Sequence, residues 1–146
     1  MIVLLSLSLA VVLSLDESSR QLCLLLSISA LPAILLYPSA KRWFAYPQAV
    51  LAFCWGFAVL LPWAAAERSL TLQPALIGCW LATLLWTFGF DTVYAMADRR
   101  DDAVIGLNSS ALSLGNRAVG TVRTCYVLTV VALGVAAASA GVHPLL

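Results

Sequence analysis

The stretch "PALIGCWLATLLWTFGFDTVYAMADRRDD", residues 74–102, decides the fold of this chain. It contains no charged residue before Asp91, and its apolar part is long enough to cross a bilayer, which takes about 20 mostly apolar residues in a helix. Pro74 is a favourable first helical residue because the N–H that it lacks would have no partner there. The stretch therefore predicts a transmembrane helix over 74–97 that continues for a turn or two toward the membrane surface.

The composition of the whole chain is that of an integral membrane protein. Hydrophobic residues make up 62% and charged residues 10%, and the mean hydropathy is +0.97. Soluble domains are about half apolar and about 25% charged, so this chain could not cover the surface of a soluble fold. We expect residues 1–146 to form a single transmembrane domain. A net charge of +1 with few, scattered basic residues gives no basis for binding nucleic acid.

Other apolar runs predict further spans. Three runs approach the required length, at 21–37, 48–66 and 118–140. A fourth, 1–15, is shorter; it has no basic residues before it and no small-residue cleavage site before Asp16, so a span clipped at its start describes it better than a signal peptide. The prediction is an all-α, multi-pass transmembrane helical bundle of about five spans.

The connecting segments fall into two sets by alternation across the membrane. One set is 16–20 and 67–73, and the other is 38–47 and 98–117. Six of the eight Lys and Arg residues belong to the second set or its margin: Lys41, Arg42, Arg99, Arg100, Arg117 and Arg123. The positive-inside rule places the second set in the cytoplasm, in a plasma membrane or its organelle equivalent.

Four of the seven acidic residues lie within 91–102. On a continuous helix, residues spaced at i+3, i+4 and i+7 share a face, so Asp91, Tyr94, Asp98 and Asp102 form one stripe, with Asp101 at its edge. The stripe lies where the apolar helix meets the headgroups. It predicts a cluster of carboxylates of one sign at the membrane surface.

Two interpretations of this cluster compete. In the first it is a solvated helix end whose acids pair with Arg99, Arg100 and Lys41, and exposed pairs of that kind contribute only about 0–1 kcal/mol. In the second it binds Mg²⁺, which prefers oxygen ligands and commonly bridges one or two carboxylates to substrate phosphates. Asp91 favours the second, because an ionisable residue inside an apolar span usually faces the bundle interior and serves a function.

The cysteines and the single histidine do not predict a metal site. Cys23, Cys54, Cys79 and Cys125 lie far apart in apolar runs, without a CxxC motif or a nearby histidine. We interpret them as small buried hydrophobic residues.

Two segments resemble a known family. "FDTVYAMADRRDDAVIGLNSSALSLG", residues 90–115, resembles the second aspartate-rich motif of the UbiA-type intramembrane prenyltransferases, most closely the 4-hydroxybenzoate polyprenyltransferases. "YPSAKRWFAYPQAVL", residues 37–51, is similar to the family's loop with a Tyr-Pro, a Lys-Arg pair and a Pro-Gln that opens the next helix. The resemblance implies Mg²⁺-dependent transfer of a prenyl chain from polyprenyl diphosphate to an aromatic acid such as 4-hydroxybenzoate, in ubiquinone or plastoquinone biosynthesis.

The resemblance also implies roles for individual residues. Asp98 and Asp102 match the metal-binding acids of the second motif, and Asp91 and Tyr94 match residues that flank the same site. Arg42 matches a basic residue that handles the aromatic acid or the diphosphate. The remaining substrate-binding residues would be Lys41, Arg99 and Asn108.

The chain departs from the family pattern in length. Family members are about twice as long and carry a first motif, Asn-Asp-x-x-Asp-x-x-x-Asp, that is absent from these residues. We therefore expect a central fragment of such an enzyme that is inactive alone and needs a complementing N-terminal half. The main alternative is a non-catalytic membrane remnant or a lipid-binding subunit. A CDP-alcohol phosphotransferase would need Asp-Gly and Gly-Ala-Arg elements that the sequence lacks, and nothing indicates the paired broken helices of a transporter.

Overall fold

The computed structural model describes residues 2–142, and all the regular elements in that range are helices. The elements in chain order are α1 (Ile2–Ser14), α2 (Glu17–Trp43), α3 (Pro47–Glu67), α4 (Pro74–Ala97), α5 (Arg99–Ile105), α6 (Ser110–Leu114), the 3₁₀ helix η1 (Gly115–Arg117) and α7 (Ala118–Ser139). The predicted all-α, multi-pass class is confirmed. Within the described residues, four helices are long and apolar enough to cross a membrane, while α1 has only 13 residues.

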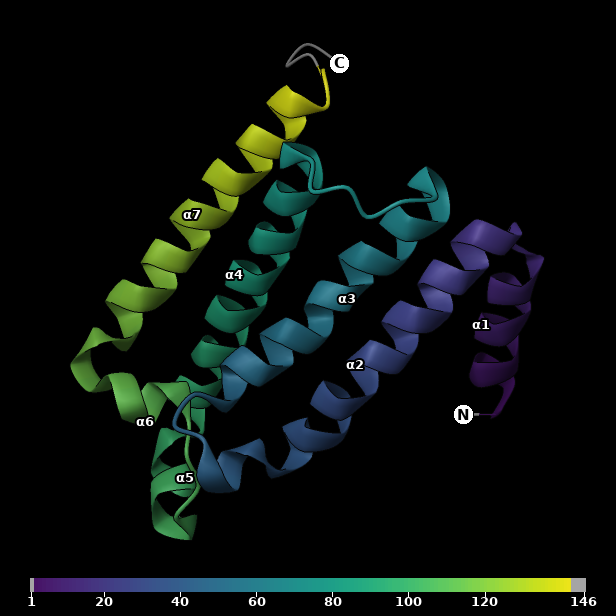
Figure 1. Cartoon of the computed structure of the whole chain (residues 1–146). Helices are drawn as coiled ribbons and strands as arrows, with labels where there is room; N and C mark the ends of the chain where they lie inside the picture. The colour runs from purple at the N-terminus through teal and green to yellow at the C-terminus, as the bar shows by residue number, and fades with distance from the viewer. Residues whose placement is uncertain (1, 143–146) are drawn as a thin grey trace.

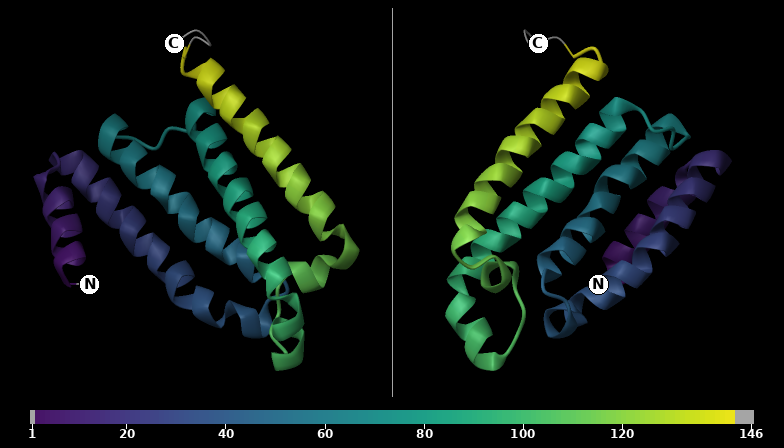
Figure 2. Two further views of the ribbon diagram at one scale, coloured as in Figure 1. Left: turned by 180° about the vertical axis from the view of Figure 1, so that it is seen from behind. Right: turned by 60° about the vertical axis from the view of Figure 1, so that its left-hand side comes forward.

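The helices stand in a row rather than around a central axis. Each long helix packs against the next, so α2 contacts α3, α3 contacts α4, and α4 contacts α7, while α1 lies against the outer side of α2. Figure 1 shows this order from the purple N-terminal helix to the yellow C-terminal one, with α5 and α6 together at one end. The two views in Figure 2 show the same succession from behind and from the side. Such a row has two broad faces, which can differ in what they contact.

Two predicted loop segments are partly helical, which corrects the predicted boundaries. The segment 38–47 was expected to be a loop, but α2 runs through Pro38 to Trp43, where Phe44 N–H donates to the Ala40 carbonyl at 2.9 Å. Lys41 and Arg42 occupy the last turn, where their positive charge interacts favourably with the helix dipole. The segment 98–117 likewise forms α5, α6 and η1. Hydropathy marks the apolar part of a helix, whereas the helix itself continues into its polar end turns.

Small residues make the closest helix contacts. A Cβ on Gly78 of α4 would lie 2.7 Å from the Ala132 carbonyl oxygen of α7, and a Cβ on Gly89 would lie 3.1 Å from the Tyr126 ring. Small side chains allow membrane helices to approach closely. Because lipid tails are as apolar as the side chains, van der Waals packing and not the hydrophobic effect holds such helices together. Cys23 and Cys125 are buried, Cys54 and Cys79 are half-buried, and all four are free thiols, as the sequence predicts for small apolar residues.

The two sets of loops lie at opposite ends of the long helices, as the alternation predicts (Figure 1). At one end Arg68 Nε lies 3.4 Å from Asp16 Oδ1, which joins the turn before α2 to the turn after α3. At the other end Lys41 Nζ lies 3.6 Å from Asp102 Oδ1, and Asn108 N–H donates to the Lys41 carbonyl at 2.7 Å. Which end faces the cytoplasm stays a prediction.

Asp16 predicts a pH dependence of stability. Hydrogen bonds from the Ser18 and Ser19 hydroxyls, with Arg68 nearby, lower the pKa of Asp16 from 3.8 to about 2. Because the folded-state pKa is depressed, its stabilising contribution is present in full above pH 3.8 and is lost as the pH falls through about 2. We expect the difference in melting temperature between wild type and Asp16→Asn in detergent to shrink over that interval. Glu17→Gln, at the exposed neighbouring acid, is the control; an equal pH-dependent difference for it would contradict the assignment.

Candidate functional site

The acidic segment begins in α4 and continues into α5 across a break at Asp98. Asp98 has φ −85° and ψ 1°, which ends the first helix. Helical hydrogen bonding nevertheless continues, because Asp98 N–H donates to the Tyr94 carbonyl at 3.2 Å and Asp102 N–H donates to the Asp98 carbonyl at 2.9 Å. Gly106, with φ +75°, then caps α5 in the left-handed conformation that glycine adopts freely. The predicted continuation past 97 is confirmed, and it lasts for two further turns.

The acidic residues of this segment lie in different environments. Asp102 is 5% exposed, Asp91 is half-buried, and Asp98, Asp101 and Tyr94 are exposed. Asp98 and Asp102 keep the predicted spacing of one helical turn, but Asp102 is buried whereas Asp98 is exposed.

Asp102 is the buried charge of the segment. Its Oδ1 pairs with Lys41, but the lysine side chain is 37% exposed, and ion pairs of that kind contribute on the order of 1 kcal/mol or less. Its Oδ2 is buried and has no hydrogen-bond partner in the described part of the chain. A buried polar atom without a partner costs about 1–3 kcal/mol. The pair thus does not account for the burial of Asp102, and Oδ2 remains available to a cation or a donor group.

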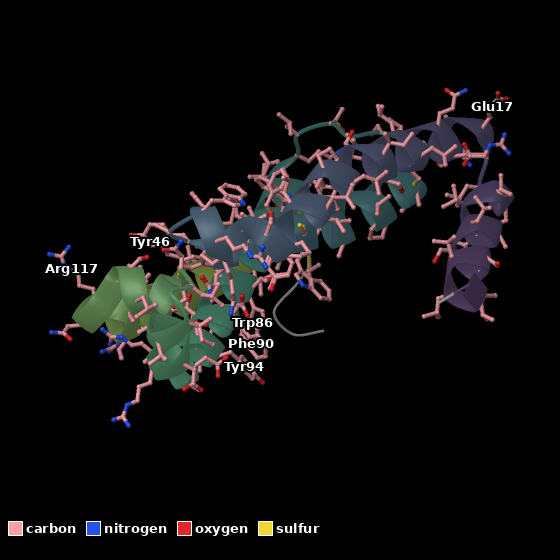
Figure 3. The ribbon with its side chains drawn as sticks, turned by 90° about the horizontal axis from the view of Figure 1, so that it is seen from below. Glu17, Tyr46, Trp86, Phe90, Tyr94 and Arg117 are labelled. Atoms are coloured by element: carbon pink, nitrogen blue, oxygen red, sulfur yellow. The ribbon has the colours of Figure 1, made fainter. Side chains whose placement is uncertain are left out.

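Asp91 lines a cavity between α3 and α4. The cavity has a volume of about 270 Å³ and is lined by Leu51, Trp55, Trp86, Thr87, Phe90 and Asp91. Two of its lining rings contact further aromatic rings in tilted geometry: Trp86 packs on Tyr126 with ring centroids 5.2 Å apart, and Phe90 packs on Tyr94 at 4.9 Å. Figure 3 shows Trp86, Phe90 and Tyr94 grouped on one side of the ribbon. Asp91 thus borders a partly open cavity, and its predicted position toward the bundle interior stays a prediction.

A polar network holds the loop after α5 against the start of α3. Ser110 N–H donates to Gln48 Oε1 at 2.8 Å, and the Ser110 and Thr92 hydroxyls lie 2.8 Å apart. Gln48, Thr92 and Ser110 are all buried. Together with the bond from Asn108 N–H to the Lys41 carbonyl, the network fixes the backbone that carries Lys41 opposite Asp102. These positioning residues are not among the predicted site residues, although Gln48 and Thr92 are polar residues within apolar runs.

The predicted basic residues are only partly brought to the acids. Lys41 contacts Asp102, whereas Arg42 and Arg99 are exposed and form no ion pair within 4.0 Å in the described residues. The Arg99 side chain extends toward η1, where its Nη2 would lie 3.9 Å from a Cβ built on Gly115. Of the pairs that the solvated-end interpretation predicts, the described residues contain the one between Lys41 and Asp102 but none with Arg99 or Arg100, while Asp98 and Asp101 are exposed as it expects.

The described residues offer a partial site for a divalent cation. No group of three or more His, Cys, Asp or Glu side chains comes together within residues 2–142. Asp102 has a free buried oxygen, and Asp98 lies one helical turn away. Mg²⁺ keeps several waters and often binds through one or two carboxylates plus phosphate oxygens. The two acids fit such an ion if a phosphorylated ligand supplies further oxygens.

Comparisons with known proteins place the chain in a family context. The sequence matches the UbiA prenyltransferase family over residues 1–146. It is 50% identical over 105 residues to a 4-hydroxybenzoate solanesyltransferase of Synechocystis, covering 72% of this chain and 35% of that protein. It is 40% identical to a 4-hydroxybenzoate octaprenyltransferase of Burkholderia multivorans (71% of this chain, 36% of that protein) and 38% identical to one of Azoarcus (93% and 45%). The chain thus spans less than half the length of these curated relatives, and no solved structure matches it.

Proposed function

The chain belongs to the UbiA prenyltransferase family, and from this premise we propose that it serves the transfer of a polyprenyl group from polyprenyl diphosphate to an aromatic acceptor such as 4-hydroxybenzoate, in quinone biosynthesis. The observation that carries the proposal is the combination of two features on one acidic segment. Asp102 has a buried carboxylate oxygen without a partner, and Asp91 lines an apolar cavity. Asp102 suits the diphosphate end of polyprenyl diphosphate, and the apolar cavity suits its hydrocarbon end.

The diphosphate end of the substrate would bind at the junction of α4 and α5. Asp98 and Asp102 would hold Mg²⁺, which neutralises the charge that develops on the departing diphosphate. Lys41, held near Asp102 by its ion pair and by the Asn108 bond to its backbone, would donate to phosphate oxygens. Arg99 is exposed and free to reach the same oxygens, and a guanidinium contacts phosphate through paired hydrogen bonds. The Asn108 side chain, half-buried beside Lys41, would add a neutral donor.

The reacting carbon would lie toward Asp91. The allylic C–O bond breaks with its electron pair leaving on the diphosphate, a ring carbon of the acceptor bonds to the allylic carbon, and the ring then loses a proton. Aromatic faces stabilise cations within about 6 Å of the ring centroid, so Trp86, Phe90 and Tyr94 would favour the allylic cation. The Asp91 carboxylate lines the cavity, where it would add a negative charge and would accept the ring proton. Walls this apolar also exclude the water that would capture the cation.

The carboxylate of the aromatic acceptor needs a basic partner. Arg42 follows Lys41 at the end of α2 and is exposed, so it is available to bind that carboxylate. By the positive-inside rule, the ends of the helices that carry these basic residues would lie in the cytoplasm. Both substrates would then meet at the membrane surface, one from the bilayer and one from the cytoplasm.

Binding and turnover test the proposal separately. We expect purified chain in detergent to bind farnesyl diphosphate in a Mg²⁺-dependent manner that EDTA reverses. Two carboxylates make only part of a metal site, so we expect no transfer to 4-hydroxybenzoate by the chain alone. Transfer should begin when it is reconstituted with the part of the Synechocystis relative that lies outside the matched region. Prenyl transfer by the chain alone would refute the expected inactivity, and the absence of Mg²⁺-dependent binding would favour the non-catalytic alternative.

A further inference from the structure

A polar hollow opens at the first turns of α7. It has a volume of about 420 Å³ and is lined by Asn116, Arg117, Gly120, Thr121, Thr124 and Cys125. Gly120 lines it without a side chain, and a Cβ added there would meet no atom within 4 Å. Arg117 is exposed and forms no ion pair within the described residues. Figure 3 shows its side chain projecting away from the ribbon, apart from the aromatic group at the Asp91 cavity. The hollow therefore presents an uncompensated positive charge.

An apolar groove follows the hollow along the same helix. It lies between α4 and α7, has a volume of about 480 Å³, and includes Leu81, Leu85, Leu128, Val131 and Val135 in its lining. The lining residues 121, 124, 128, 131 and 135 of α7 recur at intervals of three and four, so they share one side of the helix, and Arg117, the N-cap of α7, precedes them at the same spacing. From 117 to 135 the helical rise is about 27 Å, close to the roughly 30 Å of a hydrocarbon core. One side of α7 is thus polar at the membrane surface and apolar through the membrane.

This groove faces away from the cavity of Asp91. On α4, Leu81 and Leu85 line the groove, whereas Trp86 and Phe90 line the cavity. Residues five apart on an α-helix are separated by about 140° around its axis, so the groove and the cavity lie on opposite faces of the row. An ionisable residue in a span avoids lipid, which assigns the Asp91 face to the protein interior and the groove face to the bilayer.

We propose that the α4–α7 groove binds one anionic phospholipid, with its phosphate on Arg117 and an acyl chain along Leu128, Val131 and Val135. A guanidinium binds phosphate by charge-assisted, often bidentate hydrogen bonds. The Asn116 amide and the Thr121 hydroxyl line the same hollow and supply neutral contacts for the rest of the headgroup. Phospholipids of the bilayer combine a charged headgroup with a long apolar chain, as the hollow and the groove together require. The assignment is independent of the catalytic proposal, because it uses the other face of α4.

Native mass spectrometry of the detergent-solubilised chain tests this assignment. Dioleoyl phosphatidylglycerol and dioleoyl phosphatidylcholine are titrated separately, and one-to-one adducts are counted. We expect one saturable phosphatidylglycerol site that phosphatidylcholine fills at least about fivefold less tightly, because its choline brings a positive charge to Arg117. Arg117→Gln should weaken phosphatidylglycerol binding by about tenfold, the value of one hydrogen bond between charged groups. Gly120→Leu should abolish it by filling the hollow, and its Cβ would meet no described atom within 4 Å.

Two variants on α7 provide matched controls. Arg123→Gln removes the same charge from an exposed arginine that does not line the hollow, and Gly134→Leu adds the same side chain where a Cβ also meets nothing within 4 Å. Both should bind phosphatidylglycerol like wild type. Equal losses for Arg117→Gln and Arg123→Gln, or equal binding of the two lipids, would overturn the proposal. Displacement of phosphatidylglycerol by an equal concentration of farnesyl diphosphate would also overturn it, because the groove would then be a substrate site.

Discussion

Replacing Asp102 with asparagine is expected to lower the affinity for Mn²⁺, a paramagnetic substitute for Mg²⁺, at least about tenfold in the presence of farnesyl diphosphate. Loss of a group that only orients a metal ligand typically costs about 10–100-fold in metal affinity, so loss of a ligand should cost no less. Asparagine keeps the size of the side chain but removes the charge and one of the two carboxylate oxygens. Electron paramagnetic resonance of free Mn²⁺ measures the affinity, and circular dichroism checks that the helix content is unchanged.

Asp101 provides the matched control for this experiment. It is the preceding residue of α5 and carries the same charge, but it is exposed, whereas Asp102 is 5% exposed and keeps Oδ2 without a partner. Asp101→Asn should therefore leave Mn²⁺ affinity within about twofold of wild type, as expected for a screened surface charge. Asp98→Asn should resemble Asp102→Asn if both acids hold the ion. Equal losses for Asp101→Asn and Asp102→Asn would show that only the total charge at this end matters, and the metal assignment would be wrong.

The sequence predicts the spans well because hydropathy is a property of each helix by itself. Residues 48–66 and 74–97 were expected as spans and are helical as α3 and α4. The ends were harder to predict, because α2 extends into a polar turn at Lys41 and Arg42, where hydropathy gives no signal. Helix ends depend on capping and on water, neither of which an apolar window records.

The candidate site was predictable in its residue types but not in its burial. The spacing of Asp98 and Asp102 indicates one helical turn, and the hydrogen bond from Asp102 N–H to the Asp98 carbonyl confirms it. That Asp102 is buried and Asp98 exposed depends on α6, whose Ser110 is held by Gln48 from a segment 62 residues away. Contacts between distant segments decide which of two similar carboxylates faces the protein, and local periodicity cannot supply that information.

The same limit applies to the glycines of the apolar helices. Gly78 and Gly134 both lie in apolar spans, and nothing in their immediate sequence distinguishes them. In the structure Gly78 is at the crossing of α4 and α7, where its missing side chain allows the Ala132 backbone to approach. Gly134 lies on a side of α7 where a Cβ would meet no described atom within 4 Å. Their replacement by alanine should therefore have effects of opposite sign.

Gly78→Ala is expected to destabilise the folded chain by about 1–3 kcal/mol, the range for overpacking a close contact. A Cβ at this position would lie 2.7 Å from the Ala132 carbonyl oxygen and 2.9 Å from the Ala136 Cβ, so backbone must shift and not only a flexible side chain. Unfolding by sodium dodecyl sulfate in mixed micelles, followed by circular dichroism, measures the free energy. Gly134→Ala is the control and should be stabilised by about 0.5–1 kcal/mol, because alanine favours the helix and meets no obstacle. If Gly78→Ala is as stable as Gly134→Ala, the close approach of α4 and α7 does not exist in the membrane protein, and the row of helices is assembled differently.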